Sequence, residues 1–299
     1  MKNEFAPIAL FAYRRLAHTK RTIEALLENA ESKYSEIFLF CDGPKNKEVE
    51  DSVLEVRNYL SIVSGFKSVK LIFRERNLGL AKSILTGVTE VLAQYDSVIV
   101  LEDDIVTHPQ FLTYMNYYLK LYENDDRISC ISGYSYPIAD LPEFFFLKGA
   151  DCWGWASWSR VWSRLNSNGS ELLHQIEGKN LENDFDFYDS FPYTQMLRDQ
   201  IQGKNDSWAI RWYADCFLKN LLCLYPGRSL VQNIGLDLTG THSGLNMDLS
   251  PEVSKSRFLF TPNLKVEESI VAKKKFARYF KPRKFPFFRL IRRIILKLR

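Results

Sequence analysis

The sequence predicts an α/β fold in which a mainly parallel sheet is flanked by helices. Short apolar runs that indicate buried strands alternate with segments of helical periodicity over the first 122 residues. Each expected strand ends in polar or charged residues, at the edge where parallel sheets bind ligands. The 299 residues are 46% hydrophobic, enough to build a substantial core.

The elements follow one another in a regular order. Residues 8–13 form the first apolar run and residues 19–30 the first helix, with apolar side chains on one face. The pattern repeats as strand 37–41 with helix 48–60, strand 69–73 with helix 80–94, and strand 98–101. Thr107 to Gln110 resembles a capping box with proline in the first turn, which predicts a helix from there to about residue 122. Residues 128–260, rich in tryptophan, are expected to continue the domain with mixed helices and short strands.

Charge divides the chain into two parts. Residues 272–299 hold twelve Lys or Arg and no Asp or Glu, which leaves 28 basic and 36 acidic residues elsewhere, a net charge of −8. We therefore expect one acidic domain over 1–270, with halves 1–127 and 128–270, and a separate basic tail over 271–299.

Cysteine usage and hydropathy predict a cytoplasmic protein. The five cysteines are scattered and include no C-x-x-C pair, so we expect reduced and mostly buried thiols. No apolar run has the length of a signal peptide or of a membrane span, which predicts a soluble or peripheral protein.

The most informative motif is the acidic triplet Glu102-Asp103-Asp104, directly after the apolar run 98–101. Three acids at the end of a buried strand repel one another unless a cation offsets their charge. A hard divalent cation or a basic partner would do so. The alternative is a solvated acidic turn that caps the next helix.

Two other strand ends carry candidate ligand-binding residues. Asp42 precedes Gly43, and its carboxylate could accept a hydrogen bond from a nucleobase N–H; the alternative is a simple Asp-Gly turn. The segment 76–82 joins a strand to a helix, where Gly79 permits close backbone approach and Lys82 adds positive charge. A helix N-terminus in that place favours phosphate; the alternative is a loop that merely starts the helix.

Taken together, six segments resemble nucleotide-diphospho-sugar glycosyltransferases of the GT-A fold. The chain is similar to the N-acetylglucosaminyltransferase I type and, more loosely, to bacterial family-two sugar transferases. The segments are FAYRRLAHTKRTIEALL, FLFCDG, RNLGLAKSI, VIVLEDDIVTHPQFLTYM, GWASWSRVW and GLDLTGTHSG. The resemblance implies a hexosyltransferase that inverts the anomeric centre while moving a sugar, UDP-linked by expectation, to a hydroxyl of a glycan or lipid-linked glycan. Residues 1–127 would then bind the nucleotide-sugar and residues 128–270 the acceptor.

The resemblance also assigns roles residue by residue. Asp104 matches the ligand of a Mn²⁺ or Mg²⁺ ion, and Asp42 matches the acid that binds uracil. The other residues expected to bind the donor are Arg15, Asn77, Gly79, Lys82, Glu102, Asp103 and His242, the last in a late loop over residues 240–244.

The catalytic base is expected between the Trp-rich segment and that late loop. Asp206, two residues before Trp208, matches best. The family pattern has two adjacent acids before the tryptophan, whereas this chain has one in a different register, so Asp151, Asp184 and Asp215 stay as rivals. The Trp-rich stretch 153–158 would either stack on a sugar ring or pack in the core.

The basic tail has the pattern of an interfacial helix. Leu290, Ile291, Ile294, Ile295 and Leu298 share a helical face, with cations largely opposite. We expect it to bind an anionic membrane surface on the inner face of the cell membrane, and not nucleic acid, because interleaved aliphatic residues are of little use to a phosphate-backbone binder.

Two other functions fit parts of the sequence. A sugar-1-phosphate nucleotidyltransferase shares a similar nucleotide-binding fold, but it would usually carry a Gly-rich loop after the first strand, and residues 11–15 contain no glycine. A membrane-associated adaptor that kept the fold without the activity is the alternative from a different class.

Overall fold

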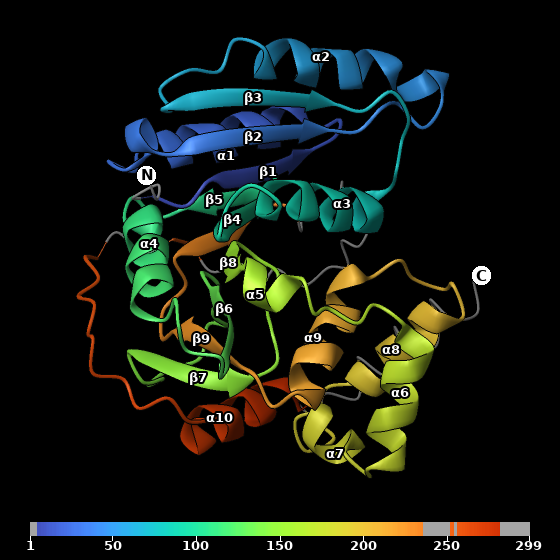
Figure 1. Cartoon of the computed structure of the whole chain (residues 1–299), viewed down its shortest axis with the longest axis vertical. Coiled ribbons are helices and arrows are strands. Elements are labelled where there is room, and N and C mark those ends of the chain that lie inside the picture. The colour runs from blue at the N-terminus through green and yellow to red at the C-terminus, as the bar shows by residue number, and fades with distance from the viewer. Residues whose placement is uncertain (1–4, 236–251, 254–255, 282–299) are drawn as a thin grey trace, which may run out of the picture.

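The computed structural model describes residues 5–235, 252–253 and 256–281 of the chain (Figure 1). Its centre is an eight-stranded sheet in the order β3-β2-β1-β4-β8-β6-β9-β7, beside a two-stranded sheet of β10 and β5. The strands are β1 Ile8–Ala12, β2 Glu36–Cys41, β3 Ser68–Phe73, β4 Ser97–Glu102, β5 Ile105–Thr107, β6 Ile128–Ser132, β7 Phe144–Lys148, β8 Trp155–Trp158, β9 Leu222–Pro226 and β10 Val231–Asn233.

The large sheet is mixed but mainly parallel, as predicted. β3, β2, β1 and β4 run in one direction, β8 runs against β4, and β6 and β9 again run parallel to β4. The edge strand β7 is antiparallel to β9. From β1 the chain continues to β2 and β3 on one side of it, and then returns to add β4 on the other side, so the strand order reverses at β1. A crevice at such a reversal of strand order is the usual ligand site of open α/β sheets.

Helices cover both faces of the sheet. One core cluster packs α1 (Leu16–Leu27), α2 (Glu50–Leu60) and α4 (Phe111–Leu121) on one face. A second cluster packs the remaining helices on the other face. These are α3 (Leu80–Leu92), α5 (Ser159–Trp162), α6 (Gly169–Gly178), α7 (Glu182–Phe185), α8 (Tyr193–Ile201), α9 (Trp208–Leu218) and α10 (Ile270–Phe280), with short 3-10 turns η1 (Ser32–Tyr34) and η2 (Lys47–Val49) elsewhere.

The predicted helix start at Thr107 is wrong. Thr107 ends β5, whose backbone pairs with β10. The helix begins later, at Phe111, with no side-chain cap, and the His108 Nδ1 atom accepts the N–H of Gln110 in the connecting turn. The polar pattern therefore marks a strand-to-helix turn and not a capping box. The other strands and helices expected in the first 122 residues are present, with ends shifted by up to three residues.

The second half continues the first half, as expected, because β6, β7, β8 and β9 complete the same sheet. The start of the tail differs from the expected boundary at 271. Residues 271–280 lie in α10, where Ala272, Phe276 and Ala277 are buried against the core. The rest of the expected tail, residues 282–299, lies outside the described part of the chain.

Two further expectations concern thiols and membrane spans. All five cysteines are free, and four of them are buried, as expected. None of the helices in the described ranges combines the length and apolar composition needed to cross a bilayer.

Candidate functional site

The predicted convergence of polar residues at one edge of the sheet is confirmed. β1 lies between β2 and β4, with Ala12 level with Cys41 and Phe11 level with Glu102. Because these strands are parallel, the residues that follow them emerge together. Arg15 stands at the N-cap position of α1 after β1, Asp42 follows β2, and Asp103 and Asp104 follow β4.

Arg15 joins the two aspartates directly. Its Nη2 atom lies 2.5 Å from Asp103 Oδ1 and 2.6 Å from Asp104 Oδ2. Asp103 also accepts the backbone N–H of Tyr13, and its carbonyl accepts the Thr22 hydroxyl at 2.9 Å. Both aspartates are buried, with 4% and 9% of their surface exposed. The ends of β1 and β4 are therefore tied together by an enclosed ion pair.

The acidic triplet carries more negative charge than Arg15 offsets. Burial raises the pKa of Glu102 to about 8, and repulsion from Asp104 and Asp103 adds to this rise. Burial also raises the pKa of Asp103 to about 6, against the opposing effect of Arg15. Burial lowers the pKa of Arg15, but Asp103 and Asp104 more than offset this and leave it raised. A further cation at this edge would stabilise the ionised carboxylates.

The two carboxylate oxygens of Asp42 differ in their hydrogen bonding. Its Oδ2 atom accepts the backbone N–H groups of Leu78, at 2.8 Å, and Gly79, at 3.0 Å. Its Oδ1 atom is buried and has no hydrogen-bond partner among the described residues. Burial raises the pKa of Asp42, while the backbone of Leu78 and Gly79 and the nearby side chain of Ser83 oppose that rise. Since a buried acceptor without a partner is costly, Oδ1 is suited to an N–H or O–H of a ligand.

The loop from β3 to α3 is shaped by these contacts. Asn77 donates to the carbonyl of Gly43, so it fixes the turn after β2. Gly79 has φ of +76°, a conformation that favours glycine, and it caps the start of α3. Because Asp42 already occupies two N–H groups at this helix start, fewer remain for a phosphate than expected. Lys82 is exposed on the first turn of α3.

A comparison with protein families identifies the first half of the chain. Residues 8–145 match the family model of Glycosyl transferase family 2. They form a glycosyl transferase family 2 domain. The domain uses a nucleotide-sugar donor and has the GT-A-like α/β fold expected from the sequence.

Solved structures and curated proteins were also compared with the chain. The mannosyltransferase PcManGT from Pyrobaculum calidifontis, in complex with GDP-Man and Mn²⁺, is 9% identical over 73% of this chain and 70% of its own, with a TM-score of 0.41. Residues 1–349 of S. aureus TarS are 10% identical over 58% of this chain and 49% of that chain, with a TM-score of 0.35. No curated protein matches the sequence.

The carboxylates at this edge of the sheet are suitable ligands for a divalent cation, but they do not complete its coordination by themselves. Carboxylate oxygens, as in Asp103 and Asp104, are the ligands that Mg²⁺ and Mn²⁺ prefer. Within the described residues, no three His, Cys, Asp or Glu side chains are grouped to hold a metal. Oxygens from the donor diphosphate and water would have to complete the coordination, as in sites that bind Mg²⁺ together with a phosphate substrate.

Asp206 lies near the candidate site, beside the loop from β3 to α3. It is exposed, directly before Ser207, whose hydroxyl caps α9 by accepting the N–H of Ile210. A Cβ atom built on Gly79 would stand 3.7 Å from Asp206 Oδ2, so the two residues are neighbours although they are far apart in sequence. The start of α9 therefore brings Asp206 to the same edge as Asp42.

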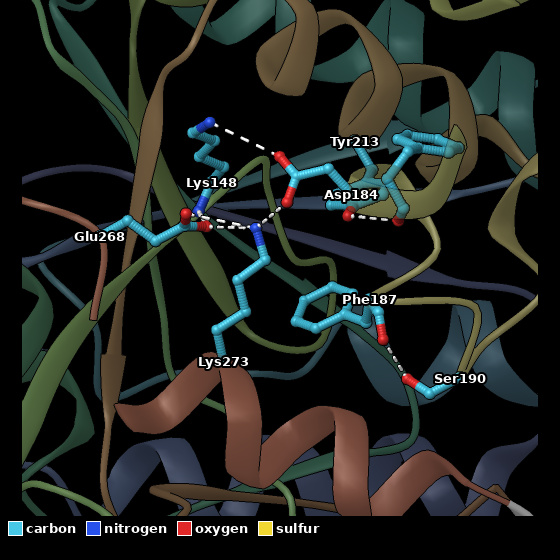
Figure 2. A network of polar contacts seen from close by, with 8 residues as sticks. Lys148, Asp184, Phe187, Ser190, Tyr213, Glu268 and Lys273 are labelled. Carbon is cyan, nitrogen blue, oxygen red and sulfur yellow. Dashed lines mark hydrogen bonds and ion pairs between the residues drawn. The ribbon is translucent and has the colours of Figure 1, made fainter. Parts of the chain in front are cut away.

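Two of the rival acids lie elsewhere. Asp184 contacts Lys148 and Lys273 (Figure 2). Lys148 is the last residue of the antiparallel strand β7 and lies level with Leu222, the first residue of β9. Both residues are therefore at the end of the sheet opposite to the acidic triplet. Asp215 pairs with Lys219 about two turns along α9, roughly 10 Å from the helix start. Neither position suits a base for donor chemistry.

Asp151 is the remaining rival. Its Oδ1 atom accepts the N–H groups of Cys152, at 2.7 Å, and Trp153, at 3.2 Å. The segment that follows Asp151 lies near the acidic triplet, because Trp155 is level with Val100 in the pairing of β8 with β4. Asp151 therefore lies close to the site but is largely engaged in its own turn.

Most tryptophans are core residues. Five of them have less than 7% of their surface exposed: Trp155, Trp158, Trp162, Trp208 and Trp212. They cannot stack on a sugar ring. Trp153 is partly exposed and meets Tyr134 edge-on, with 4.6 Å between ring centroids. It is the tryptophan in this set that could contact an acceptor sugar.

Gly235 is a site residue that the sequence reasoning did not single out. The N–H of the preceding Ile234 donates to the carbonyl of Asp104. A Cβ atom on Gly235 would lie 2.1 Å from Asp104 Oδ2 and 2.7 Å from Arg15 Nη1, so only glycine fits against the ion pair. Gly235 is the first residue of the segment GLDLTGTHSG, and this position was the sequence signal that could have identified it. The expected ligand His242, in the same segment, lies outside the described residues.

Proposed function

We propose that the protein transfers a sugar from a UDP-sugar to a glycan hydroxyl with the help of Mn²⁺ or Mg²⁺. The observation that carries the proposal is the pair of open polar atoms at one edge of the sheet. Asp42 Oδ1 is a buried acceptor and Arg15 Nη1 a buried donor, both without partners among the described residues. A uracil N–H and a phosphate oxygen would satisfy them, with the bound cation offsetting the charge of the diphosphate.

The residues of the site then have separate tasks. Asp42 orients the base, while Arg15 and Lys82 attract the phosphates. Asp104 supplies carboxylate oxygens for the cation, while Asp103 and Glu102 contact the donor. Asp206 removes the proton from the acceptor hydroxyl as that oxygen attacks the anomeric carbon opposite the departing nucleoside diphosphate, which inverts the configuration. Asp151 is the second candidate for this base.

We further propose that the acceptor is carried on the inner face of the cell membrane. α10 leaves a mixed surface exposed, with Ile270 and Val271 at 50% and 60% beside the cations Lys274 and Arg278. The basic and aliphatic sequence of residues 282–299 follows directly. Both features suit an anionic lipid surface and therefore a lipid-linked or cell-surface glycan precursor.

Substitution of Asp104 tests the metal and donor assignment. Asp104→Asn should remove most Mn²⁺-dependent donor binding and turnover while the protein stays folded. The matched control is Asp126→Asn, since Asp126 is exposed near the start of β6, at the opposite edge. Wild-type turnover by Asp104→Asn in Mn²⁺ would exclude Asp104 as a ligand.

A panel of nucleotide-sugars tests the reaction class. Thermal shifts with and without Mn²⁺ should show stabilisation by the true donor. Hydrolysis of that donor in Mn²⁺ would exclude a non-catalytic adaptor. Formation of a nucleotide-sugar from a sugar 1-phosphate and a nucleoside triphosphate, with release of pyrophosphate, would instead support a nucleotidyltransferase.

A further inference from the structure

Arg15 is paired with the carboxylates at which we propose that a divalent cation binds. A single nitrogen, Nη2, is within 2.6 Å of one oxygen from each of the neighbouring carboxylates Asp103 and Asp104. A divalent ion held by Asp104 would need the same carboxylate that Arg15 now binds. The guanidinium and such an ion therefore compete for one position.

The ion pair between Arg15 and the two aspartates is largely shielded from solvent. The side chain of Arg15 is only 20% exposed, and those of Asp103 and Asp104 are 6% and 12% exposed. Gly235 packs against the ion pair so closely that a Cβ atom would overlap it. Little water can replace the guanidinium here, so leaving the carboxylates without a cation would be costly.

Arg15 also has an unused donor. Its Nη1 atom is buried and makes no hydrogen bond to the described residues. A guanidinium prefers a partner that takes two of its N–H groups in parallel, and phosphate oxygens provide this geometry. Nη1 and Nη2 together could bind a phosphate once Nη2 is released from the aspartates.

We propose that Arg15 is a stand-in cation, which holds the two aspartates together in the metal-free protein and moves to the donor diphosphate when the metal binds. The inference rests on the proposed function. Its consequence is an order of binding. The metal alone binds weakly because it must displace Arg15, whereas metal and nucleoside diphosphate bind tightly together because the phosphate accepts the displaced guanidinium.

Titration of Mn²⁺ into the full chain, followed by the electron paramagnetic resonance signal of the free ion, tests this order without any activity measurement. We expect Arg15→Met to bind Mn²⁺ alone roughly tenfold or more tightly than the wild type, because a hydrogen-bonded charge no longer competes. UDP and GDP, used as probes, should strengthen Mn²⁺ binding in the wild type and do so much less in Arg15→Met. Arg14→Met is the matched control, since Arg14 is the exposed neighbour.

Arg15→Lys separates charge from geometry. It should keep Mn²⁺ binding weak, because a cation still competes, but lose part of the strengthening by the diphosphate, because an ammonium cannot donate two parallel hydrogen bonds. It also serves as the folded variant if Arg15→Met unfolds. If Arg15→Met binds Mn²⁺ alone no more tightly than the wild type, the stand-in role is wrong while the proposed function stands. If the wild type binds no Mn²⁺ even with UDP or GDP, the metal-dependent function fails as well.

Discussion

Lys273 should contribute strongly to stability, although it belongs to a strongly basic stretch of sequence. Its side chain is 3% exposed, and its Nζ atom contacts Asp184 and, at 3.1 Å, Glu268 (Figure 2). Burial lowers the pKa of Lys273, but the hydrogen bonds and charges of these acids more than offset this and leave it raised. The amine is therefore charged and ties α10 to α7 and to the residues before α10. Lys273→Met keeps the aliphatic volume and removes the charge.

The magnitude follows from what the substitution leaves behind. Removing one partner of a fully buried ion pair costs about 3–5 kcal/mol, because the other charge stays uncompensated. Here the side chains of Asp184 and Glu268 remain 32% and 14% exposed, and Asp184 keeps a contact with Lys148 at 3.6 Å. We therefore expect a loss of about 2–3 kcal/mol, or a fall in Tm of roughly 3–5 °C for a chain of this size.

Urea unfolding measures this loss, and Lys274→Met is the control. Lys274 is the exposed next residue on the same helix, so its substitution should change the free energy of unfolding by about 0.5 kcal/mol or less. A cycle with Asp184→Asn should show that the two substitutions are not additive. If Lys273→Met is no more destabilising than Lys274→Met, the inferred role of the ion pairs is wrong.

Four other predictions are independent of this one. Asp206→Asn should bind the donor normally, by thermal shift, but transfer the sugar roughly 10² times more slowly; near-normal transfer would place the base elsewhere. Gly235→Ala should weaken donor binding, measured by calorimetry, because its Cβ atom overlaps Asp104 Oδ2, and unchanged affinity would refute the packing argument. Burial lowers the pKa of His108, so as the pH falls the unfolded chain binds a proton before the folded protein does. Stability should therefore fall as the pH drops below about 6.5, and the fall in Tm should be smaller in His108→Gln. Deletion of residues 282–299 should release the protein from anionic vesicles in sedimentation while donor hydrolysis continues, and high salt should weaken the binding of the intact protein only in part. Continued sedimentation of the truncated protein would contradict the role of the tail.

Much of the parallel half of the fold could be predicted because each element carries its own signal. An apolar run such as 98–101 indicates a buried strand, and the period of residues 80–94 indicates a helix. The pairing of β5 with β10 could not be predicted, because it joins segments more than 120 residues apart and leaves no local pattern. This is why Thr107 was assigned to the wrong element. The burial of α10 was missed for a related reason, since Lys273 resembles any other tail cation until its partners are known.

The sequence identified most residues of the candidate site, but it did not predict the contacts that they make with one another. Strand ends identified Arg15, Asp42 and the acidic triplet, because the ends of neighbouring parallel strands must meet. The ion pair between Arg15 and the aspartates was not predicted, and neither was the use of Asp42 by the backbone of Leu78 and Gly79. These contacts depend on loop conformations that a sequence pattern does not specify.

The contact between Arg15 and Asp103 joins residues 88 positions apart in the chain. Its formation requires β1 and β4 to be paired already, so the binding site cannot assemble from a local fragment. A ligand held there stabilises the native state against global unfolding and not against fraying of a single loop. In hydrogen exchange, donor and metal should therefore slow the amides of β1 and β4 at the centre of the sheet, far beyond the residues that they contact.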